Sequence, residues 1–135
     1  MEASQFQFSN PILIDSIFKI NEEYEGEDIN YNDIPVSFNI EVMKHEKNPE
    51  ALVQLKVEVG EKGDKYPFYA LATEGAHFRW NSDEIQNPNI FLEQNAPALL
   101  LSYLRPIIAN LTAASICDAY NLPFINFSKR EEDTI

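Results

Sequence analysis

Few side chains in this sequence are of the types that catalyse reactions at neutral pH. The chain has two histidines, His45 and His77, and one cysteine, Cys117. A catalytic nucleophile needs a base within hydrogen-bond reach, and no serine or cysteine motif accompanies either histidine. Both are therefore interpreted as ordinary surface or partly buried histidines. Cys117 follows the expected helix, whose C-terminal dipole disfavours a thiolate, so it is interpreted as a small half-buried apolar side chain.

Cofactor and metal motifs are also missing. The sequence has no Walker loop, G-x-G-x-x-G or G-x-S-x-G, and its four glycines leave little for a phosphate cradle. Asp28, Asn30 and Asn32 match the first ligand positions of a calcium loop, but Asp33 and Asn39 stand where glycine and glutamate are required. We therefore expect no metal, no cofactor and no enzymatic activity. An enzyme would need His77 in a deep pocket with a carboxylate beside it.

Composition limits the classes of partner. The chain has 22 acidic and 10 basic residues and a net charge of -12, so nucleic acids and anionic membranes would be repelled. It has neither a membrane-spanning apolar run nor the features of a signal peptide, which predicts a cytoplasmic protein. Residues 1–135 are expected to form one domain with frayed termini at 1–10 and 128–135.

One segment, from Asn95 to Ala114, has apolar residues at helical spacing. Its stripe of leucines and isoleucines is roughly 140° wide, more than the about 100° that a helix lying on one sheet needs. We expect Asn95 to cap the helix, Pro106 to kink it, and residues such as Thr112 to lie on its polar side. The excess width predicts burial against another subunit.

The residues before this helix alternate between apolar and polar, which is typical of strands. The expected strands are 11–21, 34–43, 53–59 and 66–73, with an exposed crossover loop over 22–33 and a bulge at Gly75-Ala76. Short connections favour an antiparallel meander. The predicted fold is therefore α+β, a four-stranded antiparallel meander sheet with one long kinked helix packed on it.

Two segments carry a family resemblance. Leu101-Ser-Tyr-Leu-Arg-Pro106 and Asn121-Leu-Pro-Phe-Ile-Asn-Phe127 resemble the long helix and the following Asn-Leu-x-Pro segment of the SecB family of protein-export chaperones. The order of elements is similar as well, over roughly residues 12–127. The resemblance implies a homodimer or homotetramer that holds unfolded polypeptides in apolar grooves and passes them to the motor SecA.

The resemblance also implies which residues would act. The peptide groove would be formed by the crossover loop, the second strand and the residues after the helix, at Tyr31, Ile34, Phe38, Tyr120, Leu122, Phe124 and Phe127. The first strand and the helix would form the subunit interface, at Leu13, Ile17, Leu99, Tyr103 and Ile107.

The chain departs from the family pattern in three places, one of which is Ile116-Cys-Asp-Ala-Tyr120, where the family usually has Gly and Pro. Only residues 128–135 remain where the family has a second helix over the groove, and Leu71 stands at the position of an acidic SecA-contacting residue. SecA docking is therefore doubtful. The sequence favours an ATP-independent chaperone for unfolded or preprotein segments. The alternative is an oligomeric adaptor or dedicated chaperone for one partner, such as an antitoxin, without general export function.

Overall fold

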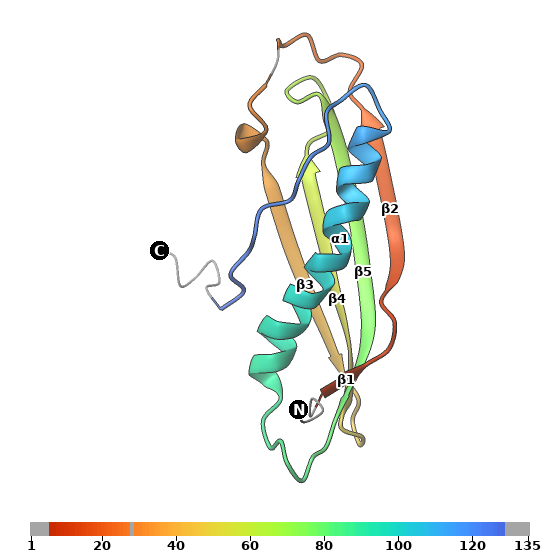
Figure 1. Cartoon of the computed structure of the whole chain (residues 1–135), viewed down its shortest axis with the longest axis vertical. Coiled ribbons are helices and arrows are strands. Elements are labelled where there is room, and N and C mark those ends of the chain that lie inside the picture. Colours follow the sequence, from red (N-terminus) through yellow and green to blue (C-terminus); the bar gives the residue numbers. More distant parts are fainter. Residues whose placement is uncertain (1–5, 28, 129–135) are drawn as a thin grey trace.

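The computed structural model describes residues 6–27 and 29–128. Five strands precede one long helix (Figure 1). The strands are β1 (Phe6–Phe8), β2 (Ile12–Ile20), β3 (Val36–Lys44), β4 (Glu50–Gly60) and β5 (Phe68–Trp80), and the helix is α1 (Ala96–Ala113). A 3-10 turn, Tyr31–Asp33, lies in the loop between β2 and β3, and a π-helical turn, Phe91–Asn95, leads into α1.

All strand pairs in the sheet are antiparallel. β3, β4 and β5 form the predicted meander, but β2 crosses over and pairs with the far side of β5. β1 pairs with the other end of β5, so β1 and β2 together line one edge of the sheet and β3 lines the other. The predicted α+β class is confirmed, with five strands rather than four.

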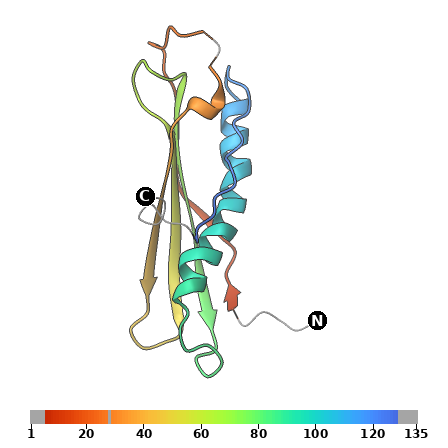
Figure 2. The same ribbon diagram turned by 90° about the vertical axis from the view of Figure 1, so that its left-hand side faces the viewer.

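The helix covers one face of the sheet (Figure 2). It packs against β4 and β5, whose alternating valines, leucines and alanines point towards it because side chains on a strand alternate between faces. Leu100, Leu104 and Ile108 of α1 are fully buried there, against Val53, Leu55 and Val57 of β4. The core is thus a two-layer sandwich of central strands and helix.

The predicted bulge lies on a different strand. β5 is continuous through Gly75, and the register shift falls in β2, between Leu13 and Asp15. A Cβ on Gly75 would stand 2.7 Å from Cδ1 of Ile14 and 3.2 Å from Cγ of Gln54. A side chain at this position would have to displace the end of the Ile14 side chain, which the bulged strand brings against the β5 backbone.

The helix begins earlier than its sequence pattern predicted. Asn95 makes no side-chain cap, because the chain is already helical from residue 89. Asn87 instead accepts a hydrogen bond from the Asn89 N–H at 3.1 Å, and Pro88 stands at the first turn, as is common for proline. Pro106 lies inside α1 on its exposed side.

Thr112 is a second correction to the helix. The sequence placed it on the polar side, but its side chain is fully buried. Its hydroxyl donates to the carbonyl of Ile108 at 2.9 Å and accepts the backbone N–H of Tyr120 at 2.7 Å. A buried hydroxyl is stable where both its donor and acceptor functions are used.

Residues 6–8 form a strand that the sequence did not predict. We expected 1–10 to fray, yet Phe6–Phe8 pairs with Phe78–Trp80, and Phe6 stacks on Phe91 with ring centroids 3.6 Å apart. Residues 1–5 and 129–135 lie outside the described residues, as does Asp28 of the rejected calcium loop.

Candidate functional site

The predicted groove residues come together beside the end of α1. After Ala114 the chain turns back and runs without regular secondary structure along α1 and β3 (Figure 1). We call residues 115–128 the C-terminal segment. It meets β3 and the loop between β2 and β3 on the helix side of the sheet, and the meeting place is lined by Tyr31, Ile34, Phe38, Tyr120, Leu122 and Phe127.

Aromatic rings connect these elements. Tyr31 contacts Tyr120 at 5.5 Å between ring centroids, and both contact Phe68 of β5 at 6.0 Å. Further along, Phe38 meets Phe127 edge-on at 6.2 Å. Tilted and edge-on pairs of this kind stabilise packing beyond the area that they bury. The structure therefore brings four of the predicted groove residues, Tyr31, Phe38, Tyr120 and Phe127, into aromatic contact, and their role stays a prediction.

Most of the predicted groove residues are buried in the core, together with the C-terminal segment. Leu122 is fully buried, and Ile34, Tyr120 and Phe127 are buried as well. Tyr31 and Phe38 are half-buried, and burial raises the pKa of the Tyr31 and Tyr120 hydroxyls. Phe124 is different, because 85% of its surface is exposed.

Three hydrogen bonds fasten residues 118–122 of the segment, beyond the Ser115 contacts at the end of α1. Besides the bond from Tyr120 to Thr112, the Tyr31 hydroxyl donates to the carbonyl of Asp118 at 2.9 Å. Nε of Arg105 donates to the carbonyl of Leu122 at 3.0 Å, and its guanidinium lies 4.2 Å from the ring centre of Phe124. Sequence reasoning missed Arg105 and Thr112 as parts of the site. The Tyr-x-Arg step singled out Arg105 but gave no partner for it.

The predicted subunit interface contains a second group of apolar side chains. Leu13 and Ile17 on β2 and Tyr103 on α1 are each about 40% exposed, at 41%, 40% and 41%, while Leu99 and Ile107 are half-buried. Ile12 and Ile14, which the prediction omitted, are 66% and 50% exposed. An edge strand that is apolar on both faces is normally covered by another molecule.

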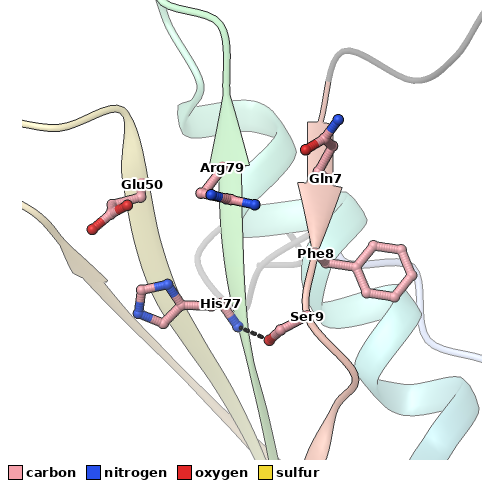
Figure 3. Close-up of a pocket in the computed structure, with 6 residues that line it drawn as sticks. All are labelled: Gln7, Phe8, Ser9, Glu50, His77 and Arg79. Carbon is pink, nitrogen blue, oxygen red and sulfur yellow. Dashed lines mark hydrogen bonds between the residues drawn. The ribbon is translucent and has the colours of Figure 1, made fainter.

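The two histidines do not form a catalytic group with other described residues. Nδ1 of His45 accepts the backbone N–H groups of Lys47 and Asn48 and so caps the turn between β3 and β4. His77 lies with Glu50 in an open pocket on the outer face of the sheet (Figure 3). No hydrogen bond joins their side chains, and the backbone N–H of His77 donates to the Ser9 hydroxyl. Cys117 is half-buried, as predicted.

Residues 6–27 and 29–128 contain no group of three or more His, Cys, Asp or Glu side chains that could hold a metal ion. None of the helices in this part of the chain is long and apolar enough to cross a membrane.

Sequence comparison relates the chain to an archaeal protein. No protein-family profile matches the chain. Uncharacterized protein MJ0357 from Methanocaldococcus jannaschii is 30% identical over 122 residues, which cover 89% of this chain and 78% of that protein. The chain belongs to the family of this archaeal protein.

Solved structures share the fold of this chain. The Mycobacterium tuberculosis SecB-like chaperone Rv1957, in complex with a ChAD peptide from the Rv1956 HigA1 antitoxin, superposes with a TM-score of 0.69 at 11% identity, over 90% of this chain and 88% of that one. A Streptococcus agalactiae protein of unknown function gives a TM-score of 0.51 at 14% identity, over 91% and 100%. The predicted SecB-like fold is confirmed, and at these identities the likeness is one of fold alone.

Proposed function

We propose that this protein is an ATP-independent chaperone that holds extended, unfolded or preprotein segments against the apolar cluster formed by the β2–β3 loop, β3 and the C-terminal segment. The observation that carries the proposal is the convergence of Tyr31, Phe38, Tyr120 and Phe127 from three separate segments, with Phe124 exposed beside them. Aromatic rings bind many sequences because their contacts are apolar and broad. No step of this activity needs a cofactor or a catalytic residue.

The SecB-like fold supports this proposal, since the Mycobacterium tuberculosis neighbour is described as a chaperone with a bound peptide. A protein that captures only open chains keeps its client unfolded by mass action, without an energy source. We further propose that two or more copies associate through β2 and α1, at Leu13, Ile17, Leu99, Tyr103 and Ile107. We place the activity in the cytoplasm, and we do not propose that the protein docks on SecA.

Suppression of aggregation tests the proposal. A denatured model protein diluted into buffer should scatter less light when this protein is present at near-stoichiometric ratio. Tyr31→Asp and Phe124→Asp should each weaken the effect severalfold, because a carboxylate in an apolar contact must be desolvated. Ile90→Asp is the matched control, since Ile90 is a 66% exposed apolar residue outside the cluster. Failure of the unmodified protein to suppress scattering at any ratio would contradict the proposal.

A dedicated partner is the second candidate. The peptide in the Rv1957 complex comes from an antitoxin, which favours a role as an oligomeric adaptor or chaperone for one such protein. Affinity capture from the native host separates the two candidates. One folded partner at fixed stoichiometry would indicate the dedicated role, and a heterogeneous set of unfolded chains would indicate the general one.

A further inference from the structure

The C-terminal segment is held mainly by side chains. None of the backbone groups of residues 121–127 takes part in a backbone–backbone hydrogen bond with another described residue. Tyr120, Leu122 and Phe127 are buried, whereas Ile116 and Phe124 are 91% and 85% exposed. The segment therefore lies in its site as an extended peptide does, with some side chains inserted and the others pointing outwards.

The receiving surface also contacts the backbone of the segment in the manner of a peptide-binding site. Thr112 accepts the N–H of Tyr120, and Arg105 donates to the carbonyl of Leu122. Both groups belong to α1, and the apolar contacts come from Tyr31 and Phe38. Backbone contacts are independent of side-chain identity, so the same surface can accept another chain of similar chemistry.

We infer that residues 120–127 are an internal occupant of the client site. The site takes an extended peptide with an aromatic residue, a leucine two positions later and an aromatic residue seven positions after the first, and Arg105 and Thr112 bind its backbone. This inference rests on the proposed chaperone function and narrows its site. The client is held by Tyr31, Phe38 and α1, and the C-terminal segment completes the apolar cluster only while no client is bound. A client must then displace the chain's own segment, whose tether gives it an effective concentration in the millimolar range.

Binding of a peptide added in trans tests the inference. The probe is a fluorescent peptide with the sequence of residues 119–128, and the readout is anisotropy. The full-length Leu122→Asp/Phe127→Asp variant should bind it at least tenfold more tightly than the unmodified protein, because the variant's own segment no longer competes. A shuffled peptide should not bind. Ile116→Asp is the matched control, since it adds charge to an exposed position of the same segment and should bind like the unmodified protein.

Arg105 gives a second readout. In the double variant, Arg105→Gln removes the donor to the peptide carbonyl and should weaken binding about tenfold, the usual effect of losing a charge-assisted hydrogen bond. Circular dichroism reports whether each variant is folded. A folded double variant that binds the peptide no better than the unmodified protein overturns the inference. An unfolded double variant also overturns it, because a displaceable segment is not required for folding.

The outcomes separate this inference from the proposed function. Suppression of aggregation by the unmodified protein, together with no gain of peptide binding in the double variant, would leave the chaperone role and remove the internal occupant. Tight peptide binding by the double variant, with no suppression by the unmodified protein, would support the site and remove general chaperone activity.

Discussion

The two edge strands of the sheet, β3 and β2, differ in how far the rest of the chain covers them. β3 alternates regularly, with Val36, Phe38, Ile40 and Val42 half-buried on the helix side and polar residues on the other face. β2 leaves Ile12, Leu13, Ile14 and Ile17 at least 40% exposed over both faces. The C-terminal segment lies against the first edge, through Phe127 and Phe38, and no described segment covers the second.

This difference separates two kinds of apolar surface. On the β3 edge, apolar side chains are covered from within the same chain, by a segment held with few backbone bonds. On the β2 edge, they are exposed, and a strand with unpaired backbone groups invites pairing with another molecule. We therefore connect the β3 edge with exchange of a peptide and the β2 edge with association of whole subunits.

The largest expected effect is on the covered edge. Leu122→Ala should lower the free energy of unfolding by about 2–5 kcal/mol, because it removes a fully buried side chain and leaves a cavity between the segment and α1. Urea denaturation followed by circular dichroism measures the change. Ile116→Ala in the same segment should cost less than about 0.5 kcal/mol, since that side chain is 91% exposed. Equal losses in the two variants would show that the segment is not packed as described.

Substitutions on the exposed β2 edge, which we call the bare edge, should change how the subunits associate. The unmodified protein should have a solution mass of at least twice its 15.5 kDa chain. Ile17→Asp should weaken this association about tenfold to a hundredfold, as a carboxylate buried in an interface costs about 1.4–2.8 kcal/mol or more. Light scattering across a concentration series measures both. The same change at Met43, 43% exposed beside the other edge, should leave the mass unchanged. A monomeric unmodified protein would remove the assigned role of β2.

The periodic elements were predictable from the sequence. Alternation at residues 34–43 and 53–59 indicated β3 and β4, and the leucine stripe indicated α1, because burial on one face requires that spacing. The order of β2 was not predictable, since its loop is long enough to reach either side of the meander. The helix start was also missed. Asn95 resembles a cap in the sequence, but the helical residues begin at 89, where Asn87 accepts the Asn89 N–H.

The site was predicted only in part, for a physical reason. The resemblance gave its apolar residues, and the structure brings most of them together. Which of them would be exposed depends on where the C-terminal segment lies, and that segment has no periodicity. Its position depends on Arg105 and Thr112, two single hydrogen-bonding side chains on α1, and no sequence pattern marks such contacts.

The smallest predicted effect concerns Glu74, which pairs in register with Leu13 of the bare edge and lies on the same face as Leu55. Its side chain is 3% exposed, and one carboxylate oxygen has no hydrogen-bond partner among the described residues. Burial raises the pKa of this carboxyl above its usual 4.5. The folded state therefore binds the proton more tightly than the unfolded state, and stability is lost as pH rises through the folded-state pKa.

Glu74→Gln should consequently stabilise the protein at pH 7 by about 1–2 kcal/mol, since it removes a buried charge that lacks a partner. The gain should shrink towards pH 4, where the native carboxyl is protonated. Urea denaturation at both pH values measures the difference, with Glu41→Gln, an exposed carboxyl on β3, as the control. The absence of a gain at pH 7 would mean that Glu74 is solvated, and that β2 and α1 leave its position open to water. A gain confined to neutral pH would show that even beside its bare edge the sheet keeps water out of the helix-facing layer.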